Sequence, residues 1–389
     1  MNKKLILYIG GFELPDKNAA AQRVLCNAKA LNNLGFDTLF VGLSKGKDIG
    51  KKIEKFEGFE YINLQYPDNL KQWLSYLTSI KQYIPFLSIK KPEMIIAYNF
   101  PAIALNELHK WSSKVKIPLI ADCTEWYEAN GNLLFRLIKS FDTYLRMKKI
   151  HPKLDGIITI SNYLFSYYSS KMKNVIKVPP LVDVNMDKWK LANNYQDSGE
   201  SVDIIYAGSP GAGNKDRIDI LLKILSQIKD EGFSKFKFTV IGITEQQYNI
   251  SFAKELPFNI RENVVFKGRM SHIDTLDEIK KAHFNIFIRD NNLANNAGFP
   301  TKLAESISCG TPVLTNATSN IQDYLKIEEN GFLLDTTSEK SIQKGIKDAV
   351  TLPLDKIQKM KEYCYQSKTF NYTNYTAHFA LLIEKLKKN

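Results

Sequence analysis

The chain has 389 residues and a formal net charge of +12, with 44% apolar and 24% charged residues. This composition is typical of soluble globular proteins and excludes wholesale disorder, a collagen-like chain and a disulfide scaffold. The length predicts two domains, and the positive surplus favours anionic partners such as phosphate groups, nucleic acid or an acidic membrane surface.

The four cysteines lie far apart, and none has a second cysteine or a histidine at metal-ligand spacing. We therefore expect a reducing compartment and no structural zinc. No apolar run reaches the ~18 residues that span a bilayer, and the run at 5–9 is too short for a signal peptide. These features predict a cytoplasmic protein, with peripheral attachment to the cytoplasmic membrane face left open.

Short apolar runs alternate with helical patterns along the chain, beginning with a strand at 5–9 and a helix at 19–34. In that helix Val24, Ala28 and Leu31 recur at helical spacing. Further strands are predicted at 38–43, 61–64, 94–98, 118–121, 156–160 and 176–178. Apolar strands separated by helices indicate parallel sheets that are covered on both faces.

The pattern pauses at 179–183 and in the polar stretch 193–201, where we place a domain boundary. It restarts with strands predicted at 203–207, 236–241, 264–267, 284–288, 312–315 and 332–334. The prediction is an α/β fold of two Rossmann-like, doubly wound domains that face each other across a cleft. The domains are 1–183 and 184–369, and a last helix at 370–389 packs back on the first.

The segment 284–316 carries the most chemistry. A strand ends at Arg289, an Asn-rich loop follows, and a helix is predicted from Pro300 to about Gly310. The start of that helix leaves three backbone N–H groups without helical partners. They belong to Thr301, Lys302 and Leu303. Together with the helix dipole they predict an anion site.

Lys302 has the wrong charge for a first helical turn, which costs ~0.3–1 kcal/mol unless an anion is bound there. A diphosphate would reverse the sign, and Arg289 at its strand end is placed to reach the same anion. Glu305, three residues on, suits the two hydroxyl groups of a ribose. The alternative is that Lys302 and Glu305 form an ordinary surface ion pair.

The stretches 298–306 (GFPTKLAES) and 309–313 (CGTPV) resemble the donor-binding signature of glycosyltransferase family 4. The stretches 206–211 and 266–269 are similar to the same family, and 179–183 is similar to its interdomain connector. The likeness covers almost the whole chain, but the specific motifs lie in the second domain. It implies the GT-B fold and a retaining transfer from a nucleoside-diphosphate sugar, with no metal and no cofactor.

The resemblance also assigns residues. It implies that Glu305 holds the ribose, that Lys215 grips the diphosphate and that Arg269 and Met270 meet the base. The first glutamate of the family's motif falls at Ala297, which leaves the sugar contacts open. The remaining donor-binding candidates are small or loop residues near the sugar and phosphate: Gly208, Gly298, Phe299 and Asn18.

The turn 208–216 nearly matches a P-loop. Lys215 stands one position late, however, and Asp216 replaces the Ser or Thr that binds Mg²⁺. A P-loop enzyme is therefore disfavoured. A turn close to the donor phosphate is favoured over a turn without a role.

Residues 121–127 follow a buried strand, so Asp122 and Glu125 are predicted to face the cleft. Glu125 is the candidate for the acceptor hydroxyl, as a contact or a base, with a helix-capping role as the equal alternative. Arg23 in the first helix is predicted to point to water.

The segment 134–149 mixes apolar residues such as Ile138 and Phe141 with basic ones, a composition found in interfacial helices. The favoured interpretation is that this helix covers a sheet.

The sequence as a whole predicts a glycosyltransferase with Lys215, Lys302 and Glu125 as its catalytic residues. Its partners would be a nucleotide-sugar donor and a glycan or lipid-linked glycan acceptor, for a bacterial surface polysaccharide. A non-catalytic binding protein of the same fold and a sugar-nucleotide epimerase are the alternatives. Nucleic-acid binding is disfavoured because no recognition motif accompanies the charge.

Overall fold

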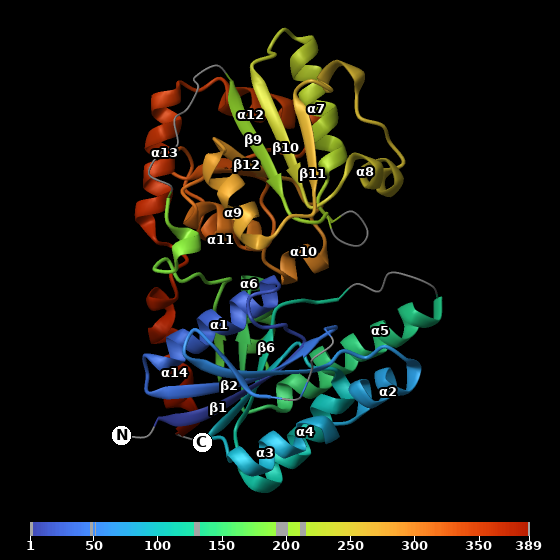
Figure 1. The fold of residues 1–389 in the computed structure, drawn as a ribbon, viewed down its shortest axis with the longest axis vertical. Helices are drawn as coiled ribbons and strands as arrows, with labels where there is room; N and C mark the ends of the chain where they lie inside the picture. Colours follow the sequence, from blue (N-terminus) through green and yellow to red (C-terminus); the bar gives the residue numbers. More distant parts are fainter. Residues whose placement is uncertain are drawn as a thin grey trace. The chain divides into compact units, whose positions relative to one another are not determined.

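The computed structural model describes residues 3–46, 50, 52–127, 133–191, 201–210 and 215–387. It divides into two compact units (Figure 1), and the predicted α/β class with parallel sheets is confirmed. Unit 1 comprises Met1–Leu181, Ala297–Phe299 and Tyr372–Asn389, and unit 2 comprises Val182–Asn296 and Pro300–Asn371. The predicted linker 193–201 lies almost entirely outside the described residues.

In its described part, unit 1 contains an eight-stranded sheet with the order β3-β4-β2-β1-β5-β6-β7-β8. The strands are β1 (Lys4–Gly10), β2 (Phe36–Ser44), β3 (Glu54–Phe56), β4 (Phe59–Gln65), β5 (Met94–Tyr98), β6 (Leu119–Cys123), β7 (Gly156–Thr159) and β8 (Val175–Lys177). Each neighbouring pair is parallel except β3 and β4, which are antiparallel. The edge strand β3 was not predicted, because it is short and half polar.

The helices of unit 1 cover both faces of its sheet. They are α1 (Ala19–Asn32), α2 (Leu70–Thr78), α3 (Ile84–Lys90), α4 (Ala102–Val115), α5 (Leu133–Leu145), α6 (Asn162–Ser169) and α14 (Thr376–Lys387). α1 begins at Ala19 because the Asn18 side chain accepts a hydrogen bond from the Ala21 amide. It buries the predicted face of Val24, Ala28 and Leu31 beside α14.

Unit 2 contains, among the described residues, a six-stranded parallel sheet with the order β11-β10-β9-β12-β13-β14. The strands are β9 (Val202–Ala207), β10 (Phe236–Ile241), β11 (Val264–Gly268), β12 (Phe284–Phe287), β13 (Val313–Thr315) and β14 (Gly331–Leu333). The order reverses between β9 and β12, and ligands of such sheets bind beyond the strand ends at that point.

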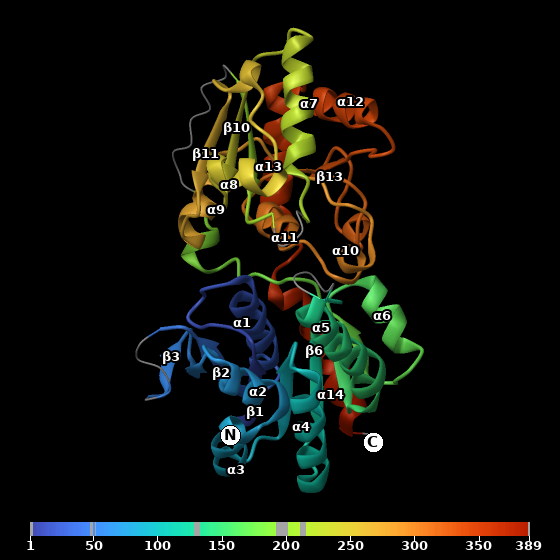
Figure 2. The same cartoon turned by 90° about the vertical axis from the view of Figure 1, so that its right-hand side faces the viewer.

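The helices of unit 2 are α7 (Ile218–Asp230), α8 (Glu245–Phe252), α9 (His272–Lys281), α10 (Leu293–Ala297), α11 (Thr301–Ser308), α12 (Glu339–Val350) and α13 (Leu354–Ser367). Figure 2 shows α7 and α12 on one face of the sheet, with α9, α11 and α13 packed together on the other. α11 brings its first turn to the end of β12, so the predicted anion site lies at the reversal point.

All four cysteines are buried and free. None of the helices in the described ranges is long and apolar enough to cross a membrane.

Candidate functional site

A buried carboxylate joins two cations at the carboxyl ends of β9 and β12. Asp216 Oδ1 lies 2.6 Å from Arg289 Nε, and Asp216 Oδ2 lies 2.8 Å from Lys302 Nζ. The Tyr206 hydroxyl donates a third bond to Oδ2 at 2.8 Å. We call Tyr206, Asp216, Arg289 and Lys302 the charged cluster. Its members come from four different segments, and all lie within unit 2.

The backbone holds these side chains in place. Asp216 and Arg289 form a short antiparallel bridge. The Asn316 side chain clamps Arg289 twice, accepting from its amide at 2.9 Å and donating to its carbonyl at 2.8 Å. Lys302 stands in the first turn of α11, and its ammonium lies 5.0 Å from the centre of the Tyr206 ring. The cluster is therefore preorganised by main-chain and side-chain contacts together.

Two glycines next to the charged cluster allow close packing that a side chain would prevent. Gly208 has φ +121°, and a Cβ there would lie 2.6 Å from Lys302 Nζ. A Cβ on Gly242 would lie 2.5 Å from the carbonyl carbon of Gly208. Any larger residue at either position would displace the ammonium or the β9 turn, so the sequence needs glycine at both.

Burial alone would raise the pKa of Asp216, but Lys302 and Arg289 lower it well below the usual range. Burial and the neighbouring Asp216 carboxylate raise the pKa of Tyr206, so its hydroxyl stays a donor. One carboxylate thus faces two cations, and the cluster keeps a surplus positive charge in a buried place. An anionic ligand would balance that charge.

Glu305 stands one turn after Lys302. Its Oε1 lies 3.4 Å from His272 Nε2, and the His272 ring packs edge-on against the buried Trp189, with centroids 6.1 Å apart. Burial raises the pKa of Glu305, but His272, Lys302 and Lys188 outweigh this and lower it. Sequence reasoning did not single out His272. Its only signal was its place just after the stretch assigned to the base.

The helix start differs from the prediction in one respect. Pro300 is the N-cap of α11 rather than its first residue, and the Leu303 amide donates to the Pro300 carbonyl at 3.1 Å. The expectation that the Leu303 amide is free for an anion is therefore wrong. The first-turn amides that remain for an anion are those of Thr301 and Lys302.

Residues 190–367 match the family model described as glycosyl transferases group 1. Residues 190–367 are thus similar to a group 1 glycosyltransferase domain. The match covers nearly all of unit 2 and includes every member of the charged cluster. The predicted resemblance is thereby confirmed at the level of the family, and glycosyl transfer is the class of activity.

Solved structures show the fold. Sucrose-phosphate synthase from Thermosynechococcus elongatus has a TM-score of 0.77 at 14% identity, over 99% of this chain and 100% of that one. Anabaena HepE in complex with UDP has a TM-score of 0.66 at 13% identity, over 97% and 99%. WaaG, a glycosyltransferase involved in lipopolysaccharide biosynthesis, has 0.64 at 12%, over 97% and 99%. The chain therefore has the predicted GT-B fold. No curated protein matches the chain.

The other predicted donor-binding residues lie in several parts of the chain. Lys215 is half-buried and directly precedes Asp216, while residues 211–214 of the glycine-rich turn lie outside the described residues. Arg269 is exposed and Met270 half-buried, just before α9 and His272. Gly298 and Phe299 are grouped with unit 1, whereas the charged cluster belongs to unit 2.

The unit 1 candidates differ from expectation. Asp122 does not face outward, because it is fully buried at the end of β6. Arg23, predicted to point to water, is buried and holds Asp122 with two nitrogens, Nη2 at 2.7 Å and Nε at 3.0 Å from Oδ1. Arg23 Nη1 also donates to the Val178 carbonyl at 3.0 Å. The pair therefore ties α1 and β6 to the chain just after β8.

Two further predicted site residues of unit 1, Glu125 and Asn18, are exposed. Glu125 is exposed beyond the end of β6, and the next described helix, α5, begins only at Leu133. Asn18 is exposed, but its side-chain oxygen caps α1.

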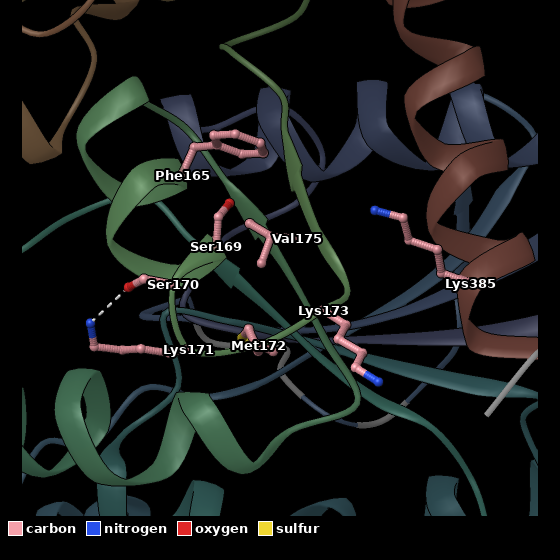
Figure 3. A pocket seen from close by; sticks show the side chains of 8 residues that line it. All are labelled: Phe165, Ser169, Ser170, Lys171, Met172, Lys173, Val175 and Lys385. Atoms are coloured by element: carbon pink, nitrogen blue, oxygen red, sulfur yellow. Dashed lines mark hydrogen bonds between the residues drawn. The ribbon is translucent and has the colours of Figure 1, made fainter.

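A pocket of about 550 Å³ lies in unit 1, between α6, β8 and α14. Figure 3 shows the side chains that line it. It is lined by Phe165, Ser169, Ser170, Lys171, Met172, Lys173, Val175 and Lys385. Lys171 turns to Ser170 and donates to its Oγ at 3.2 Å. The pocket contains none of the predicted site residues, so the charged cluster in unit 2 remains the candidate donor site.

Proposed function

We propose that the protein transfers a sugar from a nucleoside-diphosphate sugar to a hydroxyl group of an acceptor glycan, with retention and without a metal or other cofactor. The observation that carries the proposal is the charged cluster, in which one carboxylate balances only one of two buried cations. A diphosphate supplies the missing negative charge. The UDP bound to Anabaena HepE, a protein of the same fold, supports a nucleotide of this kind.

The diphosphate would rest against Lys302, Arg289 and the first-turn amides of α11. Lys215, beside Asp216, adds a third cation for the same phosphates. Glu305 would accept the two ribose hydroxyls, since its lowered pKa keeps it a carboxylate. Arg269 and Met270 would meet the base, because they lie two or three residues before His272, which contacts Glu305.

In the reaction, the bond between the anomeric carbon and the phosphate oxygen breaks, and negative charge grows on the leaving diphosphate. Lys302, Arg289 and Lys215 would stabilise that charge, which is the main electrostatic contribution to such a transfer. The acceptor hydroxyl would attack the anomeric carbon from the side of the leaving group and give up its proton. Glu125 is the candidate contact or base for that hydroxyl.

The acceptor we propose is a bacterial surface polysaccharide or a lipid-linked oligosaccharide. The role of WaaG in lipopolysaccharide biosynthesis supports this class. A thermal-shift screen against UDP, GDP, ADP and CMP would first identify the base, since a ligand that binds the folded state raises the melting temperature.

The decisive test is incubation with UDP- and GDP-sugars and an acceptor extract, with release of the nucleoside diphosphate as the readout. Release that needs both donor and acceptor, and that Lys302→Ala reduces, supports the proposal. Binding of donor with no release under any condition would instead indicate a non-catalytic binding protein. Free sugar formed without an acceptor would indicate an epimerase.

A further inference from the structure

Helix α5 carries its apolar residues on the outside of unit 1. Phe141 and Ile138, one turn apart, are 58% and 51% exposed. The other large exposed apolar side chains of the helix are Leu133, Phe135, Leu137 and Tyr144. Figure 1 shows α5 beside α4 at the margin of unit 1, and the prediction that its apolar face covers the sheet is wrong.

The polar side of α5 is the side that packs on the protein. Thr143 is only 4% exposed. Asp142 accepts a hydrogen bond from the Ala102 amide at 2.7 Å and thereby caps α4, and it lies 3.7 Å from Arg146. Phe141 and Thr143 point about 160° apart on a regular helix. The usual arrangement of an amphipathic helix is thus reversed in α5. Its polar side chains contact unit 1, and its apolar side chains face outward.

The apolar face is bordered by positive charge. Residues 133–153 contain six lysines and arginines but one acidic residue, Asp142. That carboxylate is engaged toward the protein, whereas Arg136, Lys148, Lys149 and Lys153 are exposed. Lys148 lies 5.3 Å from the centre of the exposed Tyr144 ring. An apolar stripe with tyrosine and basic residues at its border is the pattern of a helix that lies in a lipid surface.

We propose that α5 is a membrane-surface helix that seats unit 1 on an anionic lipid bilayer. The positive charge around this face distinguishes between two possible partners, a second copy of the chain and a lipid surface. A second copy of the chain, docked face to face, would bring two basic borders together, and the like charges would oppose association. Anionic headgroups would pair with the same lysines while the acyl chains receive Phe141 and Ile138. The proposal is independent of the donor site, because no residue of the charged cluster takes part.

The test is cosedimentation of the full chain with vesicles, without any sugar nucleotide. We expect binding to vesicles of phosphatidylcholine and phosphatidylglycerol in equal parts, weak binding to phosphatidylcholine alone, and a loss of binding as salt rises. The double variant Ile138→Asn, Phe141→Asn should lower the partition coefficient about tenfold or more. Lys148→Glu with Lys149→Glu should lower it on anionic vesicles only.

Phe258→Asn is the matched control, because Phe258 is an exposed phenylalanine of unit 2 and its variant should bind as the wild type does. Equal melting temperatures of all variants would show that they are folded. The proposal is overturned if the wild type stays in the supernatant with anionic vesicles, or if the double variant binds as well as the wild type. It is also overturned if the wild type is a dimer that the double variant converts to a monomer, since the face would then belong to a second copy.

Discussion

Lys302 and Asp216 form a buried ion pair in which Nζ and Oδ2 are 2.8 Å apart and the two side chains are 9% and 2% exposed. The sequence assigned Lys302 to the donor diphosphate, and the structure gives it a carboxylate partner that Arg289 shares. Because two cations share one anion, the charged cluster is held together without a ligand and keeps a net positive charge for the proposed diphosphate. If the diphosphate binds there, binding and stability are coupled at this point.

Asp216→Asn should destabilise the protein by about 3 kcal/mol, because it leaves two buried cations without their counter-charge. The same variant should gain more thermal stability from UDP or GDP than the wild type does, since the ligand would then balance both cations. Thermal-shift measurements with and without nucleotide check both effects. Asp355→Asn, at an exposed ion pair with Lys359, is the control and should change stability by no more than about 0.5 kcal/mol. Equal stability of the two variants would contradict the prediction.

Lys302→Ala and Glu305→Ala should weaken the binding of nucleotide in different ways. Lys302→Ala removes a cation from the phosphates, so calorimetry should show about tenfold weaker binding of both UDP (or GDP) and inorganic pyrophosphate, ~1.4 kcal/mol. Glu305→Ala removes the acceptor for the ribose and should weaken only the nucleotide. Lys340→Ala, in the first turn of α12, serves as the control. If neither variant changes affinity for the nucleotide, the site is not where we place it.

Acid should destabilise the cluster in a defined range. The pKa of Asp216 is lowered on folding, so its contribution to stability is complete above the ordinary carboxyl pKa of about 4 and is lost as pH falls toward the lower folded-state value. The melting temperature of the wild type should therefore fall below about pH 4. In Asp216→Asn that fall should be smaller, because the amide does not titrate. An equally steep fall in both proteins would assign the acid sensitivity to other groups.

Arg23→Met should destabilise unit 1 by about 3–5 kcal/mol, because it leaves the buried Asp122 carboxylate without its cation. The double variant Arg23→Met, Asp122→Asn should recover part of that loss, since no unpaired charge remains. Urea unfolding followed by fluorescence would measure both. Nucleotide affinity should stay unchanged in each folded variant, because the pair lies outside unit 2. Arg23→Met with wild-type stability would show that the pair contributes nothing.

The fold could be predicted closely because it follows from local pattern. Strands β5 and β10 fall at the predicted residues, since β5 is an apolar run and β10 is a mostly apolar stretch, each between two helices. β3 was missed, because Glu54–Phe56 is a strand only through its pairing with β4. The start of α11 was placed within one residue of Pro300, since a proline there marks a helix boundary.

The partners of the charged residues could not be predicted in the same way. From the sequence, Arg23 resembles a solvent-exposed helix residue, because its partner Asp122 on β6 is distant in the sequence and reaches it only in the folded chain. Asp216 was considered only as a fault in a P-loop, because its two cations lie on later segments of the chain. An outward apolar face for α5 was only the disfavoured alternative for a related reason, since a hydrophobic pattern gives the apolar side of a helix but not what that side meets. Contacts between distant segments decide these cases, and they depend on the fold.

The most direct test of the central claim is a crystal structure of the protein with UDP or GDP bound, whichever base the thermal-shift screen selects. We predict the diphosphate at the amino end of α11, within hydrogen-bond distance of Lys302 Nζ, with the ribose hydroxyls on Glu305. Nucleotide bound elsewhere, with Lys302 still paired only to Asp216, would contradict it.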